Sequence, residues 1–274
     1  MNYSIGFSPC PNDTFIFDAL VNKKIDTEGF QFEAILEDVQ TLNDWALKAK
    51  LPITKISYGV LPLVLHNYNL LNSGSALGRG VGPLLIRSAE QEMTNVDEKL
   101  IAIPGQNTTA HLLFSLAYPN AKNKIFLRYD AIENFVLQGK GLGVIIHENR
   151  FTYLEKGLKK IIDLGDYWEQ QTANPIPLGG IVIKKELNAG LQKKIDRLIK
   201  KSIEYAFSNY SILNDYIRNH AQEMSEEVMR KHIDLYVNNY SLDLGSAGKK
   251  AVEKLLDIYE NIHKTESVHR DFFV

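Results

Sequence analysis

His147 is the residue whose type and position best suit acid–base chemistry. It follows the apolar run Gly143–Ile146, which is typical of a buried strand, and ligands of open α/β sheets bind beyond the carboxyl ends of the strands. An imidazole titrates near neutral pH, so it can take a proton from carbon or oxygen and return it. Single histidines also cap helices or fill cores, and both interpretations stay open here.

The adjacent Glu148 would point away by strand alternation. The other histidines lie in helical or polar segments and are not predicted to be functional: His66, His111, His220, His232, His263 and His269.

A second candidate is the pair Lys55 and Ser57 in the predicted strand Ile53–Ser57. Period-two alternation places these two residues on one face and Thr54 and Ile56 on the other. A cation beside a hydroxyl can bind a carboxylate or a phosphate. Solvated positions at a sheet edge would carry the same pair of residues, so the pattern alone does not decide between the two interpretations.

The third candidate is the turn that precedes Thr108, Thr109 and Ala110. A predicted strand ends at Ile103, a glycine turn follows at Gly105, and two threonines then open a helix. Backbone N–H groups and hydroxyls at such a helix start can converge on one anion, although a simple helix cap would need only one threonine. No lysine follows the glycine, so the segment does not suggest a nucleoside triphosphate site.

The first strand-to-helix junction carries Ser8, Asn12 and Asp13, with Cys10 between two prolines. These polar residues could line a cleft, but a rigid capped turn explains the same composition. Cys10 is the only cysteine, which excludes an internal disulfide and a thiolate-dominated metal site. Its position fits either a reactive thiol at a turn or a small buried side chain.

A glycine-rich loop around Arg79 runs from Ser73 to Pro83 and opens a strand. A dinucleotide fingerprint opens a helix instead, so we interpret this loop as a place of close backbone approach or interlobe flexing, with Arg79 a possible cleft residue. No group of histidines and carboxylates has the spacing of metal ligands, and no metal site is predicted.

Short apolar runs that alternate with amphipathic stretches must position these candidates. This alternation predicts an α/β fold of mainly parallel sheets, and the last third of the chain, from Leu187, is predicted to be almost entirely helical. We expect two lobes with the ligand cleft between them: a larger discontinuous lobe of residues 1–95 and 180–274, and a smaller lobe of residues 96–179. The crossings are expected near 88–99 and 175–180. The strands are expected at Tyr3–Phe7, Phe30–Leu36, Pro83–Arg87, Leu100–Ile103, Ile125–Tyr129 and Gly143–Ile146.

Composition narrows the possible partners. The chain has 274 residues and a formal net charge of -2, without the basic excess that nucleic-acid binding requires. No apolar stretch is long enough to span a bilayer and no export signal is evident, so we expect a cytoplasmic protein that does not interact with a membrane. The C-terminal helical surfaces could form a homodimer. The expected partner is a small anionic organic substrate.

Taken together and in this order, these segments resemble the 1,4-dihydroxy-6-naphthoate synthases of the futalosine route to menaquinone. The resemblance covers nearly the whole chain, with one departure at Asn149, where the family pattern has glycine. The most specific segments are Ser8–Phe15, Thr54–Ser57, Gly74–Pro83, Thr108–Ala110 and Ile146–Tyr153.

The resemblance implies a two-lobed type II periplasmic-binding-protein-like fold and a lyase that needs no cofactor. It implies the conversion of cyclic dehypoxanthinyl futalosine to 1,4-dihydroxy-6-naphthoate by base-initiated carbon–carbon cleavage, with His147 as the base. Two alternatives are a chorismate dehydratase of the sister family and a non-catalytic protein that binds small anions. The missing export signal argues against the latter. The residues matching substrate-contact positions are Lys55, Ile56, Ser57, Thr109 and Ala110.

Overall fold

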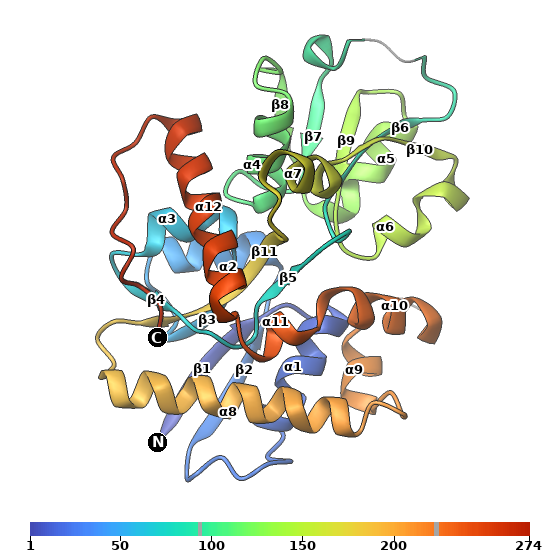
Figure 1. Cartoon of the computed structure of the whole chain (residues 1–274). Helices are drawn as coiled ribbons and strands as arrows, with labels where there is room; N and C mark the ends of the chain where they lie inside the picture. The colour runs from blue at the N-terminus through green and yellow to red at the C-terminus, as the bar shows by residue number, and fades with distance from the viewer. Residues whose placement is uncertain (93–94, 222–224) are drawn as a thin grey trace.

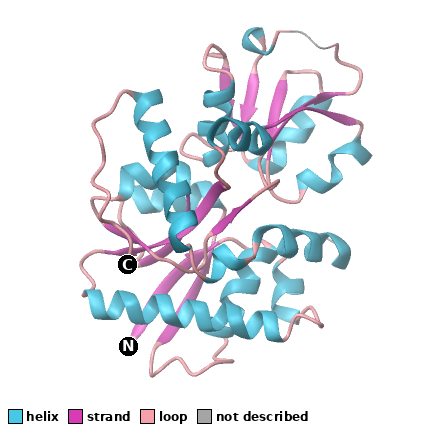
Figure 2. Ribbon diagram, in the orientation of Figure 1, coloured by secondary structure: helices cyan, strands magenta, loops and turns pink. Residues whose placement is uncertain are grey.

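The computed structural model describes residues 1–92, 95–221 and 225–274 and places two β-sheets in two lobes (Figures 1 and 2). The first sheet has the order β2-β1-β3-β11-β4, with β5 also paired to β11, and the second has the order β10-β6-β9-β7-β8. Helices cover both sheets, so the α/β architecture expected from the alternating pattern is present. The expectation of mainly parallel sheets is wrong, because β11 pairs antiparallel with β3, β4 and β5, and β6 pairs antiparallel with β9 and β10. No helix within the described residues combines the length and apolar character needed to cross a membrane.

In the first sheet, parallel β1, β2 and β3 are joined by an antiparallel β11. Successive residues of β11 alternate between two cores. Ile181 and Ile183 pack with α1, α8 and α10 on one face, whereas Val182 packs towards α12 on the other. The strands are β1 (Asn2–Phe7), β2 (Gln31–Leu36), β3 (Ile53–Ser57), β4 (Tyr68–Leu70), β5 (Ala76–Gly78) and β11 (Ile176–Lys184). The helices of this lobe are α1 (Pro11–Val21), α2 (Val39–Leu47), η1 (Tyr58–Val60), α3 (Leu61–Val64), α8 (Ala189–Ser208), α9 (Asp215–His220), α10 (Glu226–Tyr236), α11 (Asn239–Leu242) and α12 (Gly245–His263).

The second sheet is mixed, with β7 parallel to β8 and β9, and with β6 antiparallel to β9 and β10. Its own core includes Ile86, Ala102 and Ile132. The strands are β6 (Leu84–Ser88), β7 (Ile101–Ile103), β8 (Lys124–Phe126), β9 (Leu142–Ile145) and β10 (Leu158–Asp163). The helices are η2 (Val96–Glu98), α4 (Thr109–Ala117), η3 (Tyr129–Ala131), α5 (Ile132–Leu137), α6 (Asn149–Thr152), η4 (Tyr153–Lys156) and α7 (Leu164–Thr172).

The chain passes between the lobes twice, after β5 and before β11 (Figure 1). Because β6 pairs within the second sheet, this sheet begins well before residue 96, and the first crossing differs from the one expected near 88–99. The glycine-rich run makes the earlier crossing possible. Gly80 has a φ of +67°, and a Cβ at Gly82 would lie 2.2 Å from the backbone nitrogen of Gly165.

Candidate functional site

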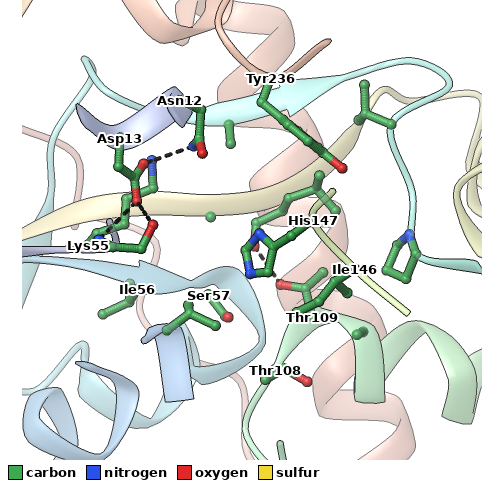
Figure 3. A pocket seen from close by; sticks show the side chains of 18 of the residues that line it. Asn12, Asp13, Lys55, Ile56, Ser57, Thr108, Thr109, Ile146, His147 and Tyr236 are labelled. Carbon is green, nitrogen blue, oxygen red and sulfur yellow. Dashed lines mark hydrogen bonds and ion pairs between the residues drawn. The ribbon is translucent and has the colours of Figure 1, made fainter. Parts of the chain in front are cut away.

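A cavity of about 760 Å³, its mouth included, lies where the two lobes meet (Figure 3). The lining combines apolar side chains such as Val39 and Leu178 with a few polar groups. All the predicted site residues except Arg79 contribute to it: Ser8, Asn12, Asp13, Lys55, Ile56, Ser57, Thr108, Thr109, Ala110 and His147.

Asp13 organises one wall of the cavity. Its carboxylate accepts hydrogen bonds from the Ser8 hydroxyl at 2.7 Å and the Asn12 amide at 2.9 Å, and it lies 3.0 Å from the Lys55 ammonium. The local fold explains this meeting, because Ser8 follows β1, Asp13 is in the first turn of α1, and Lys55 is on the neighbouring β3. All four residues are buried. The turn at Ser8 and the strand at Lys55 therefore form one hydrogen-bonded unit.

The Lys55 ammonium is already well supplied with acceptors. Besides the ion pair with Asp13, it donates a hydrogen bond of 2.8 Å to the backbone carbonyl of Gly74. An ammonium has three donors, so one N–H remains for a ligand. The positive charge of Lys55 is thus compensated within the protein, and a bound anion would need further donors.

The start of α4 offers such donors. The Thr108 hydroxyl caps the helix by accepting from the His111 N–H at 3.2 Å. The Thr109 hydroxyl donates to the Leu178 carbonyl at 2.7 Å and accepts from the Gly59 N–H at 3.0 Å. Both hydroxyls therefore have structural partners. The first N–H groups of a helix have no acceptor within the helix, so the backbone of Thr109 and Ala110 is the part of this turn suited to an anion.

Asn43 holds the backbone of the cavity residue Ser57 and was not predicted as a site residue. Its buried side-chain oxygen accepts from the Ser57 N–H at 2.9 Å, and its amide donates to the Asn107 carbonyl at 3.2 Å. It thereby links β3 of the first lobe to the loop before α4 of the second. The sequence gives little signal for this role, because a single asparagine within a helix is usually a surface residue.

His147 extends from the end of β9, as expected from the sequence, and lines the cavity. Its φ of +58° lies in the left-handed region, which is uncommon for residues other than glycine. Its Nδ1 is 3.8 Å from the Cys10 Sγ, and its ring meets the Tyr129 ring edge to face at a centroid distance of 5.1 Å. Contacts from both lobes thus fix this imidazole.

Burial favours the neutral form of the His147 imidazole. Burial lowers the pKa of the imidazole below its ordinary 6.5, although Glu148, Asp13 and Asp38 each favour the charged form. Burial also raises the pKa of the Cys10 thiol, with the charge of Glu148 acting in the same direction. Cys10 is buried, so the structure supports its interpretation as a buried protonated thiol beside His147 rather than as a nucleophile.

Two further residues of the cavity, His232 and Tyr236, come from α10. They are four residues apart and therefore lie on the same face of the helix. The His232 ring is 4.7 Å from the Tyr236 ring and 6.2 Å from the His147 ring, measured between centroids. The sequence did not indicate His232 as a functional residue, but the structure places it in the lining of the cavity. Only the tertiary fold brings α10 to the cavity, and one residue pair on an amphipathic helix gives no such signal.

Arg79 does not line the cavity, in contrast to its assignment as a possible cleft residue. Its guanidinium is 3.1 Å from the Glu169 carboxylate and donates to the Ala173 carbonyl at 3.0 Å. Glu169 also accepts from the Gly80 N–H at 2.7 Å. These contacts connect the first crossing segment to the C-terminal part of α7 and to the residue that follows it.

Comparisons with known proteins agree with this architecture. A family model described as menaquinone biosynthesis matches residues 3–261. A 1,4-dihydroxy-6-naphthoate synthase of Thermus thermophilus is 46% identical over 252 residues, which cover 92% of this chain and 91% of the relative. The corresponding protein of Streptomyces coelicolor is 38% identical over 259 residues, 92% of this chain and 90% of the relative.

Solved structures show the same fold. A protein of Archaeoglobus fulgidus superposes with a TM-score of 0.89 at 30% identity, covering 96% of this chain and 98% of that one. The alkanesulfonate-binding protein SsuA of Xanthomonas axonopodis, bound to MOPS, gives a TM-score of 0.72 at 10% identity, covering 99% and 96%. The second likeness concerns the fold alone, and it confirms the expected periplasmic-binding-protein architecture. The chain belongs to the menaquinone biosynthesis family and, within it, to the 1,4-dihydroxy-6-naphthoate synthases.

Proposed function

We propose that this enzyme converts cyclic dehypoxanthinyl futalosine to 1,4-dihydroxy-6-naphthoate and that His147 is the base that starts the reaction. The observation that carries the proposal is a partly buried imidazole, fixed in a left-handed backbone conformation at the wall of the interlobe cavity, whose pKa the surroundings lower. A base must be unprotonated at the working pH and within reach of the substrate, and His147 meets the first requirement through its burial.

The donors of the cavity are suited to the substrate carboxylate. In the proposed complex the backbone N–H groups of Thr109 and Ala110 and the Ser57 hydroxyl hold the carboxylate, and Lys55 adds its remaining N–H. Ile56 and the other apolar lining residues contact the fused rings. The ion pair between Asp13 and Lys55 keeps this wall near neutrality, so the carboxylate is held mainly by fixed dipoles.

The reaction then needs one base and a driving force. With its proton on Nδ1, donated towards the Cys10 sulfur, His147 presents the lone pair of Nε2 to the substrate. The imidazole takes a proton from the substrate, and the electron pair left behind forms a double bond in the sugar-derived fragment as the carbon–carbon bond to that fragment breaks. The electron pair of the broken bond passes into the ring system, which becomes aromatic, and the imidazolium returns its proton to the naphthoate product. Closure of the lobes around the substrate keeps water from the reacting atoms.

The test is to incubate the purified protein with cyclic dehypoxanthinyl futalosine and to follow 1,4-dihydroxy-6-naphthoate by mass. We expect product from the wild type and its loss in His147→Asn and His147→Ala. The asparagine variant is informative because asparagine tolerates a positive φ and so preserves the local backbone. His66→Ala, at an exposed histidine, is the matched control and should retain full activity.

Three outcomes would contradict the proposal. Full turnover by His147→Asn would exclude this residue as the base. Binding of the substrate without turnover by the wild type would instead favour a protein that binds small anions, and turnover of a chorismate-derived substrate would favour the sister reaction.

A further inference from the structure

His232 is a buried polar residue that the mechanism above does not use. It is 0% exposed, it lines the interlobe cavity, and neither ring nitrogen has a hydrogen-bond partner among the described residues. A buried imidazole normally satisfies at least one nitrogen, because an unpaired buried polar group is unfavourable. The lack of any partner for either nitrogen therefore needs an explanation.

The surroundings of His232 explain why the protein itself supplies no partner. Its neighbours present aromatic rings: Tyr236 at a centroid distance of 4.7 Å, His147 at 6.2 Å and Phe151 at 6.5 Å. These contacts are ring packing, and within the described residues neither nitrogen of His232 forms a hydrogen bond with any of them. The remaining side of His232 borders the cavity, so a bound molecule is the available source of a partner.

We propose that His232 is a further substrate-contacting residue, whose imidazole forms a hydrogen bond with a hydroxyl or carbonyl oxygen of the substrate. The proposal rests on the function proposed above and names a residue that recognises its uncharged, oxygen-rich part. A neutral ring has one donor and one acceptor nitrogen, which match a hydroxyl, while a carboxylate would be held by Thr109, Ala110 and Ser57 at the other wall.

The geometry separates this role from that of His147. The two rings are inclined by 30° with centroids 6.2 Å apart, and no hydrogen bond joins them. They can therefore contact different atoms of one substrate. Burial lowers the pKa of His232 well below its ordinary value, and the nearby His147 acts in the same direction, so the ring stays neutral and does not repel a protonated His147 during turnover.

The experiment measures substrate binding without turnover. Cyclic dehypoxanthinyl futalosine is titrated calorimetrically into His147→Asn, then into the same variant carrying His232→Leu or His232→Gln. We expect His232→Leu to weaken binding by at least about tenfold, since it leaves a substrate oxygen unpaired. His232→Gln keeps a donor and an acceptor and should recover most of that loss.

Stability provides the control for a merely structural role. His232→Leu removes an unsatisfied polar group, so the unliganded protein should unfold at an unchanged or higher urea concentration. Ile233→Val on the same helix packs into the core away from the cavity and should leave substrate binding unchanged. A loss of affinity in both Leu and Gln variants that parallels a loss of stability would overturn the proposal in favour of packing.

The remaining outcomes separate the two proposals. Binding to the His147→Asn parent that His232→Leu leaves unchanged would overturn the role of His232 alone. No binding of this substrate to either the parent or the wild type would overturn the proposed function, and with it this inference.

Discussion

His147 adopts a conformation that the surrounding structure has to maintain. A left-handed backbone costs a residue with a Cβ roughly 1–2 kcal/mol, and the contact of the ring with the Cys10 sulfur is long. The edge-to-face packing on Tyr129 and the start of α6 immediately afterwards hold the residue in place. Strain of this kind occurs at functional sites where the fold over-determines one side-chain position, which is the condition for a well-oriented base.

The neutral state of His147 predicts the pH dependence of catalysis. Burial lowers its pKa, so we expect the acid limb of kcat/KM to lie below pH 6.5, with activity lost as the ring becomes protonated. Glu148→Gln removes a charge that favours the protonated form and should move this limb to still lower pH. Rate profiles of the two proteins check the prediction. A limb above pH 6.5 would be incompatible with this assignment.

The ion pair between Asp13 and Lys55 predicts a large effect on stability. Both side chains are buried, so Asp13→Asn leaves an uncompensated ammonium and should lower the free energy of unfolding by about 3 kcal/mol. The double variant with Lys55→Met removes both charges and should recover part of this loss. Urea unfolding measures each step.

The exposed pair of Glu227 and Lys231 supplies the control, because Glu227→Gln should have no measurable effect. Additive losses in the double variant would show that the two charges do not interact.

Strand-to-helix junctions made most cavity residues predictable. Ser8, Lys55 and Thr109 stand at or near such junctions, where chemistry is expected in this class of fold. His232 was not predictable. It lies 85 positions after His147 in the sequence, and the residue pattern of its helix indicates only an amphipathic surface. The compensation of the Lys55 charge by Asp13 was equally hidden, since it depends on the pairing of β1 with β3.

At the scale of elements, the approach of η1 to α4 determines the geometry of the wall that we propose to bind the substrate carboxylate. A Cβ on Gly59 would lie 2.5 Å from the carbonyl carbon and oxygen of Thr108 and 2.7 Å from the Thr109 nitrogen. All three are backbone atoms, which cannot rotate away as a flexible side chain can. Glycine is therefore required here for contact with the helix start.

Gly59→Ala should displace the N-terminus of α4 and lower kcat/KM by at least about tenfold, because small displacements of positioning groups are costly in catalysis. Steady-state kinetics and substrate titration on the folded variant measure the effect. Gly190→Ala is the matched control, since its Cβ would meet only the Asn188 side chain at 3.4 Å in the first turn of α8. Unchanged kinetics in Gly59→Ala would show that α4 can shift without harm to the site.

Periodicity predicted the longer elements better than the short ones. The strand at Ile53–Ser57 and the helix from Thr109 agree with β3 and α4. The strand expected at Ile125–Tyr129 is shorter, because a 3-10 turn takes over at Tyr129. The three-residue strands β4 and β5 are too short for a period to be visible, and β10 carries lysines that mask its alternation.

At the scale of the whole molecule, the lobes meet through the residues of the site itself. Asn43 reaches Asn107, Thr109 joins Gly59 to β11, and Cys10 faces His147 across the junction. Residues such as Thr109 and His147 therefore both line the cavity and join the two lobes. The sequence indicated two lobes through its alternating pattern, whereas the position of the first crossing depended on which sheet β6 joins, a long-range pairing that local patterns do not encode.

Buried histidines predict how the stability of the entire fold responds to acid. Burial lowers the folded-state pKa of the fully buried His232 and of the partly buried His111 and His147 below 6.5. Below pH 6.5 the unfolded chain therefore binds protons that the folded chain does not, so the free energy of unfolding falls as the pH decreases. Above pH 6.5 these histidines do not change the free energy of unfolding with pH. Carboxylates such as Glu28, whose pKa the neighbouring Lys194, Lys201 and Arg197 lower to about 2, act only in a more acidic window.

The expected loss in this window is measurable and can be traced to one residue. Each proton taken up only by the unfolded chain lowers the free energy of unfolding by about 1.4 kcal/mol per pH unit. Urea unfolding at pH 8, 7, 6 and 5 should therefore show a plateau followed by a decline. His232→Leu removes a fully buried histidine and should make the decline shallower, whereas the exposed His66→Ala should not. An identical decline in His232→Leu would mean that the folded protein accepts a proton at His232, in which case the ring would not be the neutral group that substrate recognition requires.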